Sequence, residues 1–163
     1  MMATLAGRAL LIWAAWTLYA VFSASQNFVS RAYSARIDFK PAFLYALVDS
    51  YTWAVLTPLV LLVAARLMVR RANWWRNVPL LFLISVGFAV IHLNVFVRLL
   101  PLIGYRNNFR AVQSIFTAKF HSDLLTCWAL IAIRHAMEYY RQVRIRELTI
   151  IGTNVAPFGP PDR

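Results

Sequence analysis

Long apolar runs separated by short polar stretches dominate this chain. Three runs approach the roughly 20 residues that a helix needs to cross the hydrocarbon core of a bilayer: Ala9–Phe28, Phe43–Ala65 and Val78–Val97. A fourth, Leu124–Ile133, is about half that length, and it reaches a full span only if the residues on either side of it extend it with their polar tips turned outward. The pattern predicts an all-α integral membrane protein, a four-helix transmembrane bundle with a cytoplasmic helical exit.

The composition supports a membrane protein over a soluble one. Hydrophobic residues make up 61% of the 163 residues and charged residues 14%, whereas a soluble domain of this size needs a larger polar share to cover its surface. The net charge is +11. The arginines lie between the apolar runs, where they anchor helix ends in anionic lipid, so we expect the lipid bilayer as a partner and no nucleic acid. Cys127 is the only cysteine, which excludes an internal disulfide.

The arginines also predict an orientation. Four follow the second run (Arg66, Arg70, Arg71 and Arg76), and three follow the fourth (Arg141, Arg144 and Arg146). Basic loops favour the cytoplasmic side. Four crossings with both groups inside predict a multi-pass protein of the cell inner (plasma) membrane with both termini cytoplasmic. The same arrangement leaves six basic residues outside: Arg31, Arg36, Lys40, Arg106, Arg110 and Lys119.

Polar residues within the apolar runs or beside them gather toward one side of the predicted membrane. They are Asp49, His92, Asn94, His121 and Asp123, all near the outer ends of their spans. Ionisable groups at this depth are costly and face the bundle interior with a partner. They predict a pocket or polar switch near the outer face, with Asp49 and His92 as its central pair. The alternative is that the same side chains only bond packed helices to one another.

The sequence predicts no metal centre, no cofactor and no catalytic site. His121 and Asp123 are two positions apart, so they diverge on a helix. His135 and Glu138 share a face but lack a third ligand. No nucleophile motif or phosphate-binding loop is present, and we therefore expect no enzymatic activity of the chain as it stands.

The fourth run continues into a basic, helix-favouring stretch. Residues 1–148 are predicted to form the membrane domain and the start of a linker, and residues 149–163, rich in proline and glycine, a disordered tail. The residues that we expect to carry a signal through this exit are Arg134, His135, Glu138, Tyr139, Tyr140 and Arg141. Arg134 and Glu138 are four positions apart, which favours an ion pair along the helix.

Three stretches together resemble a known family. "FHSDLLTCWALIAIRHAMEYYRQVRIREL" (Phe120–Leu148) resembles the last membrane helix and linker of LytS-like sensor histidine kinases, in the internal-region histidine kinase family. "YTWAVLTPLVLLVAARL" (Tyr51–Leu67) and "VGFAVIHLNVF" (Val86–Phe96) are similar to that group's second and third helices. The resemblance covers roughly residues 9 to 148. It implies a membrane-embedded input module of a two-component system, a homodimer through its transmembrane helices, and signal transduction to a kinase and response regulator.

The chain departs from this family after Leu148. The family's phosphoacceptor segment and ATP-binding domain have no counterpart here, and His135 does not match the phosphoacceptor, because no proline precedes it and no Phe-Leu-Phe-Asn follows. The resemblance therefore implies a sensor region truncated before its kinase core. The alternative from the residues alone is a small transporter or channel subunit, or a purely structural membrane subunit.

Overall fold

The computed structural model describes residues 5–32, 39–69, 72–105 and 109–154 and is helical throughout. Its elements are α1 (Leu5–Ala32), α2 (Phe39–Arg66), α3 (Trp74–Leu99), the short 3-10 helix η1 (Leu100–Ile103) and α4 (Phe109–Asn154). No strand occurs within these ranges. The predicted all-α class is confirmed.

Three of the four helices are long and apolar enough to cross a membrane. The qualifying segments are Ala9–Val29, Phe39–Arg66 and Trp74–Ile103. Each contains one of the three long runs of the sequence, and the second and third segments extend beyond their runs at both ends. Large apolar side chains such as Leu18, Phe22 and Leu83 point outward and are more than half exposed. An apolar exterior of this extent fits lipid as the surrounding medium.

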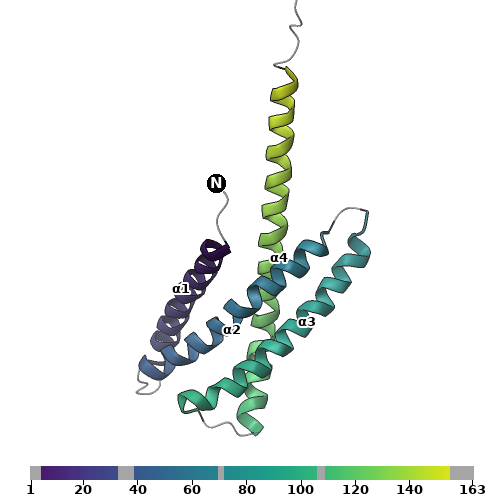
Figure 1. Cartoon of the computed structure of the whole chain (residues 1–163). Helices are drawn as coiled ribbons and strands as arrows, with labels where there is room; N and C mark the ends of the chain where they lie inside the picture. The colour runs from purple at the N-terminus through teal and green to yellow at the C-terminus, as the bar shows by residue number, and fades with distance from the viewer. Residues whose placement is uncertain (1–4, 33–38, 70–71, 106–108, 155–163) are drawn as a thin grey trace, which may run out of the picture.

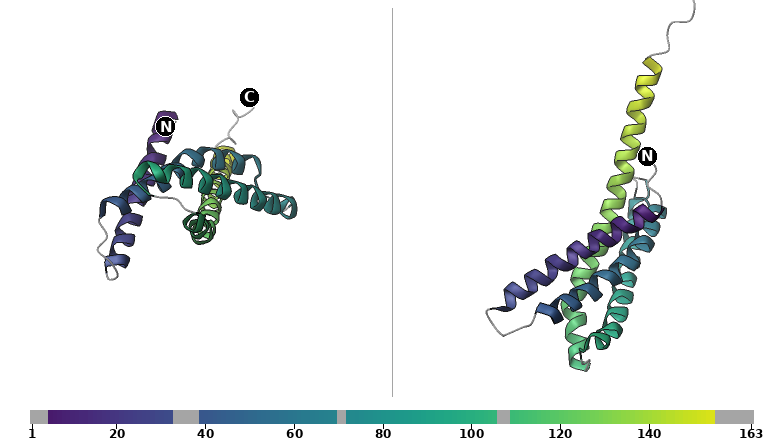
Figure 2. Two further views of the ribbon diagram at one scale, coloured as in Figure 1. Left: turned by 90° about the horizontal axis from the view of Figure 1, so that it is seen from below. Right: turned by 60° about the vertical axis from the view of Figure 1, so that its left-hand side comes forward.

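Helix α2 lies between α1 on one side and α3 and α4 on the other (Figures 1 and 2). Among the described helices, α1 contacts α2 alone. Three small side chains are almost fully buried in this contact, Ala20, Ala24 and Ala46, and aromatic pairs such as Trp16 and Trp53 pack beside them. Small residues let two helix backbones approach closely. The indole Nε1 of Trp16 adds a hydrogen bond to Thr57 Oγ1 at 2.9 Å.

The other side of α2 forms the core with α3 and α4. Apolar side chains from all three helices pack together in it: Trp53, Leu56, Val60, Ala64, Leu81, Cys127 and Ile131. The connection between α3 and α4 begins with η1, which is followed by Gly104, whose φ of +86° is the left-handed conformation that glycine adopts without strain. This connection reverses the chain so that α4 packs back along α3.

Helix α4 is a single helix of 46 residues, which corresponds to about 69 Å at 1.5 Å per residue. Its first part packs on α2 and α3, and its second part projects beyond the bundle (Figure 1). The apolar run at 124–133 lies inside this helix, yet α4 is not among the three helices that meet the length and hydropathy requirement for a membrane span. The helix also continues to Asn154, so residues 149–154 are helical and do not belong to a disordered tail as predicted. Their residue types do not favour a helix, but extending an existing helix costs less than nucleating one. The rest of that tail lies outside the described residues.

The two ends of the bundle differ. The start of α1, the end of α2 at Arg66 and the start of α3 at Trp74 lie at the end from which α4 projects (Figure 1). We call this the exit end. The other, which we call the turn end, contains the end of α1, the start of α2, η1 and the start of α4.

Candidate functional site

Three helices each place a pair of residues, four positions apart, in the space between them. Residues at this spacing lie on the same face of a helix, so an inward-facing residue brings its pair with it. The pairs are Asp49 and Trp53 on α2, His92 and Phe96 on α3, and Lys119 and Asp123 on α4. They meet in the half of the bundle nearer the turn end. We call Asp49, His92, Lys119 and Asp123 the buried charge cluster.

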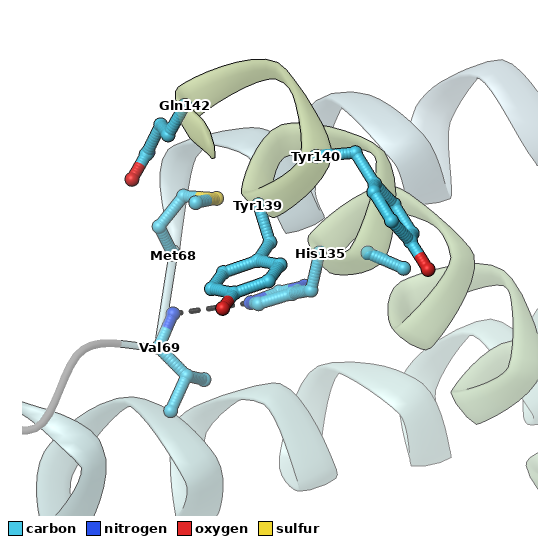
Figure 3. Close-up of a pocket in the computed structure, with 7 residues that line it drawn as sticks. Met68, Val69, His135, Tyr139, Tyr140 and Gln142 are labelled. Carbon is cyan, nitrogen blue, oxygen red and sulfur yellow. Dashed lines mark hydrogen bonds between the residues drawn. The ribbon is translucent and has the colours of Figure 1, made fainter. Parts of the chain in front are cut away.

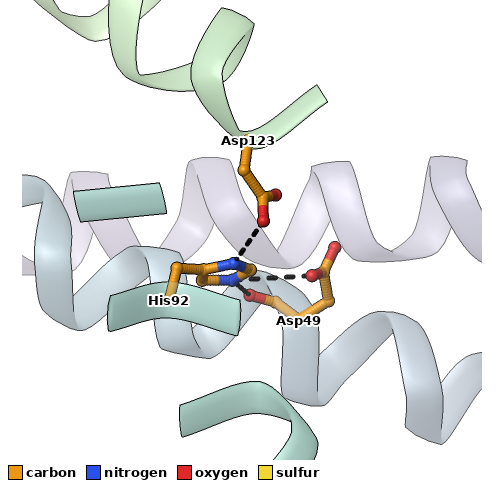
Figure 4. Close-up of side chains that lie close together, drawn as sticks. All are labelled: Asp49, His92 and Asp123. Carbon is orange, nitrogen blue, oxygen red and sulfur yellow. Dashed lines mark hydrogen bonds and ion pairs between the residues drawn. The ribbon is translucent and has the colours of Figure 1, made fainter. Parts of the chain in front are cut away.

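The imidazole of His92 lies between two carboxylates (Figure 4). Its Nδ1 is 2.9 Å from Asp123 Oδ2, and its Nε2 is 3.5 Å from Asp49 Oδ1 and 3.3 Å from the backbone oxygen of Asp49. The His92 side chain is fully buried, and Asp123 and Asp49 are 2% and 8% exposed. His92 on α3 therefore joins α2 to α4.

Lys119 completes the cluster. Its Nζ is 2.8 Å from Asp49 Oδ1, the closest ion pair in the described part of the chain. The ammonium also lies over the rings of Phe96 and Tyr45, 5.2 Å and 5.9 Å from their centroids, which adds cation–π attraction. The Lys119 side chain is 19% exposed, the highest value in the cluster. The cluster thus reaches the protein surface along this side chain.

Aromatic rings hold the imidazole in its orientation. Trp53 stacks on His92 with centroids 4.6 Å apart, and its Nε1 lies 3.4 Å from Asp123 Oδ1. The ring of Phe96 is nearly parallel to that of His92, with centroids 6.0 Å apart. These rings exclude water, and hydrogen bonds are electrostatically stronger in such a low-dielectric interior.

The charges in the cluster nearly cancel. Two carboxylates and one ammonium leave one negative charge over, and both ring nitrogens of His92 face oxygen acceptors. A neutral imidazole donates from one nitrogen only, whereas an imidazolium donates from both. One more positive charge beside His92 would balance the cluster, and an unbalanced buried charge is costly.

Apolar side chains close the cluster toward the exit end. Four apolar side chains from three helices are buried on the exit side of the cluster: Val60, Ala64, Leu81 and Ile131. The described helices therefore continue no line of charged groups from the cluster through the core.

The structure brings together part of the predicted polar cluster. Asp49 and His92, the predicted central pair, are in contact, and Asp123 joins them. The placement of Asn94 and His121 in the cluster was wrong, because both are exposed. Asn94 Nδ2 donates to Val90 O on its own helix at 2.8 Å, and His121 packs against Phe120. Each lies two positions from an inward-facing residue, and two positions turn a helix by about 200°.

Three residues of the site were not predicted from the sequence. Lys119 was read as a charge outside the membrane, and Trp53 and Phe96 were not considered as partners of the polar residues. Their spacing was the available indication, because Lys119 precedes Asp123 by four positions and Trp53 follows Asp49 by four.

A second contact between helices occurs at the exit end (Figure 3). His135 Nε2 accepts a hydrogen bond from the backbone N–H of Val69 at 3.1 Å, and its Nδ1 donates to Ile131 O at 2.9 Å. These two bonds fix the tautomer that carries its hydrogen on Nδ1. His135 therefore ties α4 to the segment that follows α2.

The remaining residues of the predicted signal path lie on the same stretch of α4. The expected ion pair is present, with Arg134 Nη1 3.6 Å from Glu138 Oε2, and Arg141 approaches the same oxygen at 3.9 Å. Tyr139, Tyr140 and Arg141 are exposed. An open pocket of about 550 Å³ lies between this stretch and Val69, lined by Met68, Val69, His135, Ala136, Tyr139, Tyr140 and Gln142.

One group of described side chains has the chemistry and proximity of metal ligands. Asp49, His92 and Asp123 each offer one ligand atom, and these atoms lie within 4.8 Å of one another. The two pairs considered from the sequence, His121 with Asp123 and His135 with Glu138, each lie on one helix, whereas these three residues come from three helices.

Comparisons of the chain with protein-family models, with curated proteins and with solved structures find no match.

Proposed function

We propose that this chain is a membrane-embedded input module of a two-component signalling system, in which the buried charge cluster controls the position of α4. A change in the position of α4 is then transmitted to a kinase and response regulator at the exit end. One observation carries the proposal. Lys119 and Asp123 belong to the same unbroken helix as the projecting segment. From Asp123 to Asn154 that helix covers about 46 Å at 1.5 Å per residue.

The path of the chain supports four crossings. Helix α1 begins at the exit end, and three successive apolar helices bring the chain to the turn end. Helix α4 starts there, packs on α2 and α3 and extends past the exit end (Figure 1). It therefore passes the full depth of the bundle, and its apolar residues 124–133 serve as the centre of a fourth span.

The exposed arginines support a cytoplasmic exit end. Arg66, Arg76, Arg141, Arg144 and Arg146 are exposed on the segments that meet there. Basic residues beside membrane helices favour the cytoplasmic side, so the proposal places both termini in the cytoplasm of a cell with this protein in its inner (plasma) membrane.

The apolar core argues against a transporter or channel subunit. A pathway through the bundle needs polar groups that face it along its length. In the described core on the exit side of the cluster, Val60, Leu81 and Ile131 are apolar, and the buried hydroxyls of Thr57 and Ser85 donate to backbone oxygens of their own helices. A purely structural subunit differs from an input module in one respect, because in a structural subunit a change in the cluster leaves α4 where it is.

A distance measurement tests the proposal. Spin labels at Ala72 and Leu148, both exposed, report the position of α4 relative to the exit end of α2 and α3, in a chain whose buried Cys127 is replaced by alanine. His92→Gln removes the contacts of α3 with the carboxylates of Asp49 and Asp123 and leaves the sequence of α4 unaltered. We expect the distance distribution to shift, by on the order of 1–2 Å or more, as helix shifts in switching proteins do.

Asn94→Ala is the matched control, because Asn94 is exposed on the same helix and bonds to its own backbone. We expect it to leave the distribution unchanged. Identical distributions for His92→Gln, Asp123→Asn and the unaltered chain, in variants that retain their helicity, would rule out the proposed coupling.

A further inference from the structure

We propose that Asp49, His92 and Asp123 form a binding site for a divalent transition-metal ion such as Zn²⁺, and that Lys119 occupies the position of its charge when the ion is not bound. The proposal rests on the proposed function, because it names the chemical class of the stimulus that acts on the buried charge cluster.

The ligand types select the class of metal. Zn²⁺ combines imidazole nitrogen with carboxylate oxygen, whereas Ca²⁺ and Mg²⁺ prefer sets made of oxygen alone with six or more ligands. Here one imidazole lies between two carboxylates, and all three residues are buried. A borderline divalent ion fits this set better than a hard one.

The distances suit direct binding by two of the residues. A tetrahedral ion with bonds of about 2.0–2.2 Å separates neighbouring ligand atoms by about 3.3–3.6 Å. His92 Nε2 and Asp49 Oδ1 are 3.5 Å apart. These two atoms are therefore already at the spacing that one shared ion requires, and water completes its coordination.

Asp123 has a different part in the site. Its Oδ2 is 2.9 Å from His92 Nδ1, the ring nitrogen on the far side from Asp49. Histidine ligands of metals commonly donate their second N–H to a carboxylate, which fixes the tautomer and the ring orientation. Asp123 is thus a positioning residue that leaves Nε2 free of hydrogen and directed at the ion.

The charges balance when the ion replaces the ammonium. Two carboxylates and one divalent ion sum to zero with a neutral imidazole. Lys119 Nζ lies 2.8 Å from Asp49 Oδ1, the same oxygen that the ion would bind, so ion and ammonium compete for it. The partly exposed lysine has a flexible stem that can carry its ammonium to the surface. The ion enters along the path that Lys119 leaves.

This exchange connects the metal to α4. Lys119 and Asp123 are both on α4, so binding of the ion removes one contact between α4 and α2 while it retains the contact between α4 and His92. The helix then pivots about Asp123, which is the motion that the proposed function requires.

Direct titration tests the site. The full chain, purified in detergent without a histidine tag, is titrated with Zn²⁺ by calorimetry and with Co²⁺ by visible absorption. We expect one ion per chain, and with Co²⁺ the absorption bands of a tetrahedral nitrogen and oxygen site. Asp49→Asn and His92→Gln should abolish binding. Asp123→Asn should weaken it by about 10–100-fold, as loss of a carboxylate that supports a metal ligand does.

Lys119→Met separates a metal site from a merely structural cluster. In a merely structural cluster this change only destabilises the fold, whereas a metal site also loses the charge that competes with the ion, so we expect the variant to bind Zn²⁺ more tightly than the unaltered chain. His121→Gln is the matched control, since His121 is exposed two positions from Asp123, and it should bind as the unaltered chain does.

The outcomes separate this inference from the proposed function. No stoichiometric binding, binding that persists in Asp49→Asn, or weaker binding by Lys119→Met overturns the metal site, even if His92→Gln moves α4. Zn²⁺ binding that leaves the distance between labels at Ala72 and Leu148 unchanged establishes the site and contradicts the signalling role. Circular dichroism of each variant identifies any that fail to fold, and Lys119→Met and His121→Gln retain all three proposed metal-site residues.

Discussion

His92 Nδ1 and Asp123 Oδ2 are 2.9 Å apart in the interior of the bundle, although 31 positions separate the two residues in the chain. The contact joins α3 to the long helix that leaves the bundle. Since His92 also faces Asp49 across its ring, a change at this one imidazole alters how α4 is held by both neighbouring helices.

The His92–Asp123 contact should appear as coupling between mutations. His92→Gln and Asp123→Asn each leave a buried partner unpaired, so the double variant should lose less free energy of unfolding than the sum of the two single losses, by roughly 0.5–3 kcal/mol. Denaturant unfolding in detergent, followed by circular dichroism, measures this. Pairing His92→Gln with Asn94→Ala supplies the control cycle, and additivity in both cycles would show that the contact does not form.

Lys119 should stabilise the fold through Asp49 when no metal is present. Lys119→Met leaves the buried Asp49 carboxylate without its ammonium partner, and we expect a loss of roughly 1–3 kcal/mol in the free energy of unfolding, the range for a buried group left unsatisfied. Lys119→Arg keeps the charge and should recover much of the loss. Lys40→Met, at an exposed position of α2, should be nearly neutral. A Lys119→Met chain as stable as the unaltered one contradicts the ion pair.

The α1–α2 contact should fail when its small residues are enlarged. Ala24 is fully buried against α2, and Ala24→Leu inserts three carbon atoms into a close-packed surface, at a cost of about 1–3 kcal/mol. Because α1 contacts only α2 among the described helices, hydrogen exchange should rise in α1 and stay slow around His92. Ala15→Leu, at an exposed position of the same helix, should leave exchange in α1 unchanged. Equal exchange in both variants would exclude the packing seen here.

The proposed topology predicts the location of three reporter fusions. Fusions at Asn73 and Asn154 should report the cytoplasm, and a fusion at Asn107 should report the outside, because the basic residues at the exit end favour the cytoplasmic side of the membrane. A cytoplasmic reading at Asn107 would exclude four crossings.

The two-component part of the proposal predicts the behaviour of a chimera. The phosphoacceptor and ATP-binding domains of a LytS-like kinase, joined after Leu148, should autophosphorylate at a rate that His92→Gln changes and Asn94→Ala leaves alone. If His92→Gln leaves the autophosphorylation rate unchanged while the spin labels show that α4 moves, the movement of α4 does not control a kinase of this kind.

The positions of the helices followed from the sequence because a membrane helix satisfies its own backbone hydrogen bonds. In an apolar medium each N–H and C=O must find a partner within the segment, so a long apolar run defines a helix without reference to its neighbours. Ala9–Phe28 and Val78–Val97 were found in this way, and the structure places helices over both. Leu124–Ile133 was too short for the rule, and only the packing of α4 along α2 and α3 shows that it belongs to the same bundle.

The partners of each polar side chain required the tertiary structure. A helix that is apolar on most sides has no polar face that marks its orientation, so nothing in the sequence says whether His92 or Asn94 faces inward, although two positions turn the helix by about 200°. The depth of Asp49 and His92 in their spans was enough to predict that they meet. The rotation of α3 and α4 about their axes places Lys119 and Asp123 in that site and leaves Asn94 and His121 at the surface. That rotation is set by the packing of all three helices together.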